Sequence, residues 1–235
     1  GLVGSEMCIR DSYGILPMIV GSIYVTAGAL VIGVPIGILT AVFMARFCPP
    51  WLYKIMKPAT NLMAGIPSVV YGFFGLVILV PFVRDTFGGR GMSVLTASIL
   101  LGLMILPTII SMSEASIRAV PQSYYEGGLA LGASHERSVF FTVVPAAKSG
   151  IFASVVLGVG RAIGETMAVM MVAGNQTVIP EKITDGVRTL TTNIVMEMGY
   201  STDLHREALI ATAVVLFVFI LIINLSFSLL KRRSK

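Results

Sequence analysis

The stretch GMSVLTASILLGLMILPTIISMS, residues 91–113, contains no charged side chain. About 20 consecutive apolar residues are needed for a helix to cross the hydrocarbon core of a membrane. Lipid offers no hydrogen-bond partner to backbone N–H and C=O groups, so a spanning segment must be a helix or a strand of a closed barrel. The run does not alternate between apolar and polar residues, which excludes a barrel strand. The stretch therefore predicts a transmembrane helix.

The same pattern recurs along the chain. Runs without charge also cover 12–45, 58–83 and 208–230, and only two charged residues interrupt 149–180. Hydrophobic residues make up 55% of the chain and charged residues 12%, whereas a soluble domain carries about 25% charged residues. The predicted fold class is all-α, a polytopic helical membrane protein with five spans. These spans are expected at 19–45, 63–83, 93–113, 150–173 and 208–230.

The distribution of basic residues predicts which loops face the cytoplasm. Lys and Arg are more frequent in the loops on one side of the spans, and KRRSK at 231–235 follows the last span directly. Cytoplasmic loops carry an excess of Lys and Arg, so this side is predicted to be cytoplasmic. Loop 114–149 is then cytoplasmic, while 84–92 and 174–206 face outward. The net charge of +5 is explained by this topology and does not indicate nucleic-acid binding.

The first residues differ from the rest of the chain. GLVGSEMCIRDS, residues 1–12, has neither the basic start nor the apolar centre of a signal peptide, so we interpret it as a non-native leader. The predicted topology leaves the chain start outside, which suggests that a preceding first span is missing. Without Cys8 of this leader, Cys48 is a single thiol that can form no internal disulfide. No residue spacing typical of a metal site occurs.

One polar segment, YYEGGLALGASHERSVFFTVVP at 124–145, lies between the apolar runs. Pro121 predicts the start of a helix, and Gly132 predicts a left-handed end. Ser134 can cap a second helix, which Pro145 would end. Two short cytoplasmic helices joined at Gly132 are therefore expected. The local pattern leaves open whether they form a solvated connector or dock onto a cytoplasmic partner.

Two charged residues, Arg161 and Glu165, fall within the predicted span 150–173. Their spacing of four would place both on one face of a continuous helix. A central Arg costs about 2.5–3.5 kcal/mol to insert, so such residues usually face a cavity or a partner. One interpretation is an internal ion pair that neutralises two buried charges. The other is a transport site, in which the Arg161 guanidinium binds an oxyanion and Glu165 balances the positive charge of Arg161.

The polar segment also resembles a known motif. Glu126, Gly132 and Pro145 match the spacing of the EAA motif of ABC-importer permeases, with Gly127 and Gly128 in place of its two alanines. Further stretches resemble the permease of the bacterial phosphate-specific importer, and ETMAVMMVAGN favours its PstC-type subunit over the PstA-type subunit. The resemblance covers residues 13–232. The four stretches that resemble the phosphate-importer permease are AGIPSVVYGFFGLVILVPF (64–82), MILPTIISMSEASIRAVPQS (104–123), GRAIGETMAVMMVAGN (160–175) and RTLTTNIVMEMG (188–199).

The resemblance implies a type I ABC-importer permease, which has six spans and both ends in the cytoplasm. The loop at 121–145 would couple the chain to an ATP-binding subunit dimer, through Glu126, Gly127, Gly128, Gly132 and Pro145. Further implied partners are a PstA-type second permease subunit and a periplasmic or lipid-anchored phosphate-binding protein. The chain would lie in the bacterial inner membrane as a multi-pass protein among lipid. It would hold no cofactor or metal and no catalytic residue of its own.

Two classes of function compete. The first is a permease for inorganic phosphate, with sulfate, molybdate or phosphonate as alternative substrates, driven by ATP hydrolysis on a separate subunit. The second is a self-contained secondary anion transporter that uses Arg161 and Glu165 as a proton-linked relay. The loop at 121–145 favours the first, because a stand-alone carrier has no need of a coupling segment.

Overall fold

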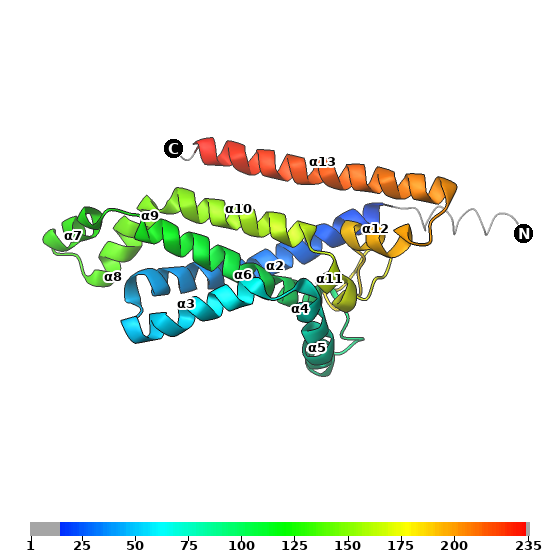
Figure 1. Ribbon diagram of the computed structural model, residues 1–235, viewed down its shortest axis with the longest axis horizontal. Helices are drawn as coiled ribbons and strands as arrows, with labels where there is room; N and C mark the ends of the chain where they lie inside the picture. Colours follow the sequence, from blue (N-terminus) through cyan, green and yellow to red (C-terminus); the bar gives the residue numbers. More distant parts are fainter. Residues whose placement is uncertain (1–14, 234–235) are drawn as a thin grey trace, which may run out of the picture. The chain divides into compact units, whose positions relative to one another are not determined.

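The computed structural model describes residues 15–233, so the predicted leader at 1–12 lies outside the described residues. Every regular element in this range is helical, and one isolated parallel bridge joins Gly174 to Val187. The helices are drawn in Figure 1. They are α2 (Leu16–Val42), η1 (Phe43–Phe47), α3 (Pro50–Gly65), α4 (Ser68–Phe74), η2 (Gly75–Leu79), α5 (Val80–Phe87), α6 (Val94–Arg118), α7 (Gln122–Ala130), α8 (His135–Ser138), η3 (Val139–Val143), α9 (Val144–Ala146), α10 (Lys148–Gly164), α11 (Met167–Val172), α12 (Leu190–Met198) and α13 (Asp203–Arg233), where η marks π-helical turns.

Four of these helical stretches are long and apolar enough to cross a membrane: Leu16–Phe47, Ser68–Phe87, Val94–Arg118 and His205–Ser226. A fifth is added if His135–Ala146 and α10, which meet at an angle of 68°, are counted as one broken span. The all-α fold class is confirmed. α6, which contains the run without charge described first, is the most enclosed, with 72% of its apolar window buried.

The helix expected through 150–173 is interrupted. α10 ends at Gly164, Glu165 and Thr166 are not helical, and α11 begins at Met167. The expectation of one continuous helix here is wrong. Apolar composition alone does not show such a break, because the residues on both sides are equally suited to lipid.

The chain folds into two compact units, each assembled from three stretches of sequence. Among the described residues, the first unit comprises 15–29, 67–103 and 162–223, and the second comprises 30–66, 104–161 and 224–233. Helices α2, α6, α10 and α13 each contribute to both units.

The second unit has a core in which α2, α6 and the helical turns after Ser134 meet (Figure 1). The Ser113 and Ser154 hydroxyls are 2.7 Å apart and join α6 to α10. A Cβ added at Gly158 of α10 would lie 3.2 Å from Ile109 of α6, so the missing side chain allows the two helices to approach closely. The buried core residues are Ala41, Val42, Ile117, Val120, Val139, Val143, Ala147 and Ile151.

In the first unit, α11 packs tightly on α4. A Cβ at Gly72 of α4 would lie 3.0 Å from the Cα of Ala168 and 2.7 Å from the sulfur of Met171, so only glycine fits this approach. The loop after α11 is tied to the start of α6 by backbone hydrogen bonds. Ser93 N donates to Val172 O at 3.1 Å, and Leu95 N donates to Ile183 O at 2.9 Å. The loops around these bonds are therefore held in place by the helix ends.

Candidate functional site

The polar segment after α6 has the local structure that its sequence predicts. Pro121 precedes α7 as its N-cap residue, and Gly132 has a φ of +82°, in the left-handed region. The Ser134 hydroxyl caps α8 by accepting a hydrogen bond from Arg137 N at 3.3 Å. Helical turns then run from His135 to Ala146, one residue beyond Pro145. The prediction of two helices joined at Gly132 is confirmed.

The two glycines at the alanine positions of the motif have different surroundings. A Cβ at Gly127 would meet nothing within 4 Å. A Cβ at Gly128 would lie 2.6 Å from the Ser138 hydroxyl and 3.1 Å from its Cβ. Ser138 is buried, and its hydroxyl has no hydrogen-bond partner among the described residues. Gly128 therefore allows α7 to pack on α8 and η3, whereas Gly127 faces open space, as Glu126 does on the same exposed helix.

We predict that Gly128→Ala disturbs this packing and that Gly127→Ala does not. The added methyl at position 128 must displace Ser138, which costs about 1–3 kcal/mol for overpacking. Either change improves helix propensity by about 1 kcal/mol, so the two variants differ only in the packing cost at position 128. Limited proteolysis of loop 121–145 in the purified protein should show faster cleavage of Gly128→Ala and unchanged or slower cleavage of Gly127→Ala. Equal cleavage rates would contradict the packing role of Gly128.

An aromatic cluster fixes the segment to η1, which directly follows α2. The Tyr125 hydroxyl and His135 Nδ1 are 2.7 Å apart, which joins α7 to α8 across Gly132. The Phe47 ring packs edge-on against His135, with 4.8 Å between centroids. Arg46 Nη1 donates to Gln122 Oε1 of α7 at 3.4 Å, while its Nη2 donates to Ile117 O of α6 at 3.3 Å. These contacts hold the two short helices in a defined position on the second unit.

Three large apolar side chains of the segment are mostly exposed. Leu131 is 92% exposed, Phe141 78% and Tyr124 51%. We call these three residues the coupling surface. A segment with this much polar sequence has no reason to expose large apolar side chains to water, and such patches mark interaction sites. All three belong to the segment 121–145, for which the motif implies a coupling role.

Arg161 lies in the last turn of α10 and is half-buried. Its Nη1 donates to the Thr108 hydroxyl at 3.1 Å. Thr108 lies near the middle of α6, whose apolar window is the most buried among the four candidate spans. A guanidinium has five donors, and a neutral hydroxyl satisfies one of them without neutralising the charge. The Arg161 guanidinium therefore has a neutral hydrogen-bond partner, and this partner lies near the middle of the apolar helix α6.

Glu165 follows the end of α10 and caps the next helix. Its Oε1 accepts hydrogen bonds from Thr166 N at 3.1 Å and from Ala168 N at 3.2 Å, at the N-terminus of α11. A carboxylate is favoured at this end of a helix. The expected shared helical face with Arg161 is wrong, because the helix ends at Gly164, between the two residues. Glu165 thus caps α11, a structural role that its position four residues after Arg161 does not indicate.

Glu165 also lines a small cavity rich in hydroxyl groups, within the first unit. Ser22 and Thr26 of α2 and Thr189 and Thr191 near the start of α12 line it as well. The cavity has a volume of about 10 Å³, close to the minimum for one water molecule. Thr191 Oγ1 donates to Glu165 O at 3.1 Å, and the Ser22 hydroxyl accepts from Leu190 N at 3.0 Å. In this conformation the cavity is too small for an oxyanion.

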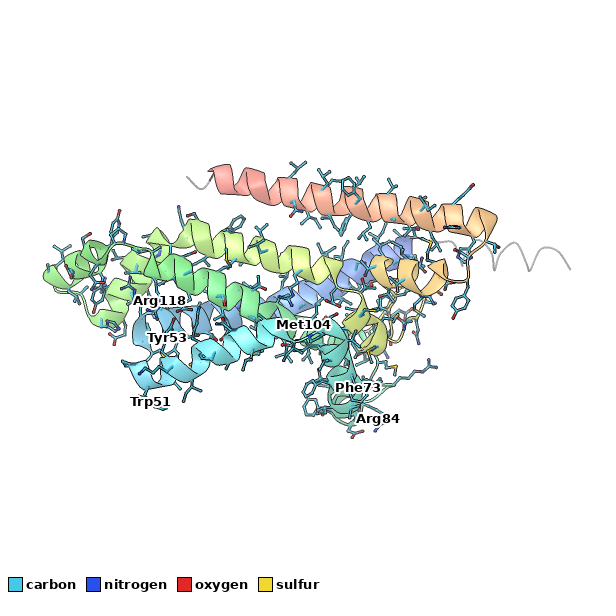
Figure 2. All side chains as sticks on the ribbon, viewed as in Figure 1. Trp51, Tyr53, Phe73, Arg84, Met104 and Arg118 are labelled. Atoms are coloured by element: carbon cyan, nitrogen blue, oxygen red, sulfur yellow. The ribbon has the colours of Figure 1, made fainter. Side chains whose placement is uncertain are left out.

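A buried carboxylate that sequence reasoning missed is Glu114, which is 1% exposed. It accepts hydrogen bonds from Tyr53 Oη at 2.7 Å, Lys57 Nζ at 2.6 Å and Arg118 Nε at 2.8 Å. The Arg118 guanidinium lies over the Tyr53 ring, 4.5 Å from its centroid (Figure 2). Hydrogen bonding to Glu114, followed by burial, raises the pKa of Tyr53 above its ordinary value.

This network joins α3 to α6. The spacing of Glu114 and Arg118 could have indicated their pairing, because residues four apart are neighbours on a helix. The contribution of Tyr53 and Lys57 could not be inferred, because it depends on α3 folding back onto α6.

The family model and the similar proteins agree in describing transport permeases. The family model described as "Binding-protein-dependent transport system inner membrane component" matches residues 33–235. The chain is 44% identical to a probable ABC transporter permease, YqgH, of Bacillus subtilis, over 90% of this chain and 71% of the relative. It is 33% identical to the phosphate transport system permease PstC of Mesorhizobium japonicum, over 92% of this chain and 72% of the relative. The corresponding protein of Pasteurella multocida is 30% identical, with coverage of 97% and 78%.

Solved structures show the same fold at low sequence identity. The MetNI methionine ABC transporter, in an inward-facing conformation, aligns with a TM-score of 0.69 at 20% identity and covers 94% of each chain. An amino acid ABC transporter solved with histidines aligns with a TM-score of 0.68 at 17% identity and covers 97% of each chain. The helical arrangement is thus that of ABC-importer permeases.

Proposed function

Because the chain belongs to the family of binding-protein-dependent transport system inner membrane components, we propose that it moves inorganic phosphate across the cytoplasmic membrane. The chain is a permease of an ABC importer, located in the inner membrane, and ATP hydrolysis takes place on a separate ATPase subunit. This family also implies a substrate-binding protein as a partner. The substrate and the identity of the second permease half are the proposed parts.

The observation that carries the phosphate proposal is the environment of Arg161. Its guanidinium lies in the last turn of α10 and donates to a neutral hydroxyl, so its charge is available to an anion. The planar fork can donate two parallel hydrogen bonds to phosphate oxygens. Relatives named as phosphate permeases support phosphate over sulfate, molybdate or phosphonate.

Glu165 is the second residue that we assign to the transport pathway. It lines a cavity with four hydroxyl side chains, and the cavity would have to widen in another conformation before these neutral groups could donate to a phosphate oxygen. Its carboxylate also repels an anion, which favours release. A permease must release its substrate in every cycle, so a pathway that combines attraction with repulsion is suitable.

The second proposed role is coupling through loop 121–145. Glu126, Gly127, Gly128, Gly132 and Pro145 would position the segment in a groove of the ATPase dimer. The exposed side chains of Tyr124, Leu131 and Phe141 supply apolar surface for this contact. The PstA-type second permease subunit and the phosphate-binding protein complete the proposed assembly.

Transport in reconstituted vesicles tests the proposal. The chain is purified with a PstA-type subunit, an ATPase dimer and a phosphate-binding protein, and incorporated into vesicles with ATP on the ATPase side. Uptake of labelled phosphate is expected only with ATP and should persist in excess unlabelled sulfate or molybdate. Uptake without ATP would favour the secondary-transporter alternative. ATP-driven uptake of sulfate or molybdate in place of phosphate would overturn the substrate assignment.

A further inference from the structure

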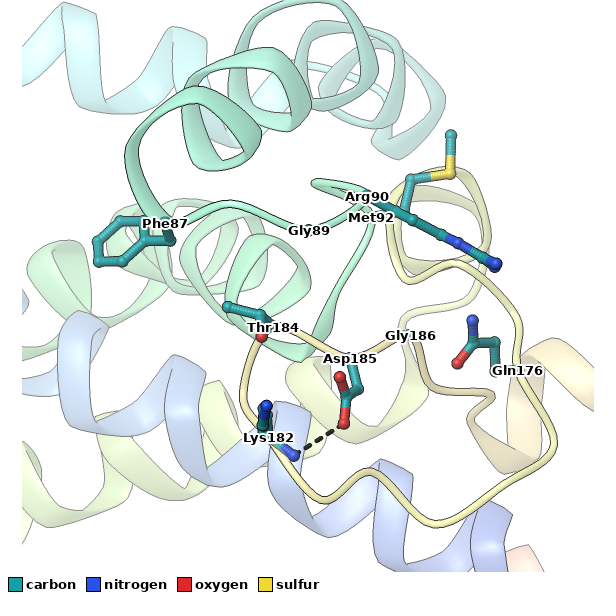
Figure 3. Close-up of a pocket in the computed structure, with 9 residues that line it drawn as sticks. All are labelled: Phe87, Gly89, Arg90, Met92, Gln176, Lys182, Thr184, Asp185 and Gly186. Carbon is teal, nitrogen blue, oxygen red and sulfur yellow. Dashed lines mark hydrogen bonds between the residues drawn. The ribbon is translucent and has the colours of Figure 1, made fainter.

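A further charged site lies within the first unit. The loop after α5 and the segment between α11 and α12 enclose a pocket of about 460 Å³ (Figure 3). Arg90 and Gly89 line it from the first loop, and Gln176, Lys182 and Asp185 line it from the second. Both segments fall in loops that the distribution of basic residues predicts to face outward.

The walls of this pocket are held in place by backbone contacts. Val94 N donates to Asp185 O at 2.9 Å, next to the bond between Leu95 N and Ile183 O. Gly91 has a φ of +76°, and a Cβ there would lie 2.3 Å from Val80 O, so the loop is pressed against α5. A Cβ at Gly186 would lie 3.1 Å from the Gln176 side chain. The pocket is therefore built by the fold and does not depend on a bound partner.

The charged side chains of the pocket differ in whether they have a hydrogen-bond or ion-pair partner. Asp185 Oδ2 accepts hydrogen bonds from Glu181 N at 3.1 Å and from Lys182 N at 2.8 Å, so its negative charge is partly used by backbone donors. Arg90 and Lys182 take part in none of the ion pairs found within residues 15–233. By contrast, Arg84 and Arg188 of neighbouring segments are paired with Asp85 and Glu197. The pocket thus presents two cations that have no carboxylate partner in the described chain.

The size and exposure of the pocket indicate how an anion would bind. Water occupies about 30 Å³ per molecule in the liquid, so 460 Å³ holds a small anion together with part of its hydration shell. Arg90 and Lys182 are exposed, so each attracts an anion only weakly and in a salt-dependent manner. Arg90 and Lys182 outnumber the one carboxylate of the lining, Asp185, and a cleft of net positive charge raises the local concentration of an anion. Such a site captures an anion briefly and does not store it.

We propose that this pocket is an outer capture site for a hydrated inorganic oxyanion, held by Arg90 and Lys182. This proposal rests on the proposed function, because it takes the two loops to face the outside and the transported ligand to be phosphate. The Gln176 amide and the Thr184 hydroxyl, which also line the pocket, supply neutral donors to the anion. Capture here would retain phosphate close to the permease after the binding protein releases it.

Phosphorus NMR of the assembled importer without binding protein and without ATP tests this site. Line broadening of inorganic phosphate is measured at low and at high salt for the native complex and for Arg90→Gln/Lys182→Gln. The matched control is Arg84→Gln/Arg206→Gln, which removes the same charge from the same predicted side outside the pocket. We expect the salt-sensitive part of the line broadening to be about tenfold smaller in the pocket variant than in the native complex. The reason is that electrostatic focusing raises the local ligand concentration by a factor of about 10–10³. The control should remain close to the native complex.

Equal broadening in the pocket variant and the native complex would overturn the capture site, whatever the transport activity. Loss of broadening in both variants would also overturn it, because the effect would then come from the general surface charge. If phosphate broadening is unchanged but stimulation of uptake by the binding protein is lost, the pocket holds an acidic side chain of that partner and the proposal is wrong. Failure of the proposed function is a separate result, namely no ATP-driven phosphate uptake by the native importer.

Discussion

Arg161→Gln is expected to lower phosphate uptake by about ten- to a hundredfold while the importer still assembles. A hydrogen bond to a charged group contributes about 1.5–3 kcal/mol, and glutamine keeps polarity but loses the charge and the fork. Glutamine can still donate to the Thr108 hydroxyl, so the contact between α10 and α6 need not be lost. Uptake is measured in vesicles at matched protein content, with complex yield after purification as the measure of assembly.

Two further variants separate transport from structure. Thr108→Val removes the neutral partner of Arg161 but leaves the charge, so uptake should fall less than in Arg161→Gln. Glu165→Gln removes a charge but keeps an oxygen that can accept from Thr166 N and Ala168 N. Assembly should therefore survive in Glu165→Gln while transport is impaired.

The opposing interpretation is that Arg161 and Glu165 only neutralise each other. In that case either single change strands a charge and harms folding, and Arg161→Gln/Glu165→Gln recovers both assembly and uptake. Near-normal uptake by this double variant would remove both residues from the transport pathway. Low uptake by an assembled double variant would retain them.

Leu131→Asp is expected to abolish detectable association with the ATPase subunit, and ATP-driven uptake with it. Leu131 is 92% exposed, so the change should alter the stability of the isolated chain by no more than about 0.5 kcal/mol. Covering a leucine contributes about 1.5–3 kcal/mol, and a carboxylate at the same place must in addition be desolvated. Association is measured by co-purification of the ATPase with the permease from detergent.

The control for this variant is Val178→Asp. Val178 is 71% exposed and lies in the segment after α11, in a loop predicted to face outward. It introduces the same charge at a similarly exposed apolar residue, and ATPase association should remain normal. Normal co-purification of the ATPase with Leu131→Asp would remove the coupling surface from the docking role.

Much of the helical structure could be predicted from the sequence, because it depends on residues that are close together in the chain. Absence of charge over lengths that suit a bilayer predicts helices, and α2, α6 and α13 formed where expected. Pro121, Gly132 and Ser134 determine the two short helices of the polar segment through fixed φ angles and side-chain capping. These preferences act within a few residues and need no tertiary contact.

Tertiary structure decided the features that depend on residues distant in the chain. Gly127 and Gly128 are the same residue in the same helix, and only the position of Ser138 makes one of them essential for packing. Glu165 caps α11 because α10 stops at Gly164, a break that apolar composition does not reveal. Glu114 gains Tyr53 and Lys57, and Arg90 and Lys182 come to line one pocket, because separate segments fold against each other. Hydrophobicity and backbone preference act locally, whereas contacts such as those of Glu114 with Tyr53 and Lys57 require two distant segments to meet.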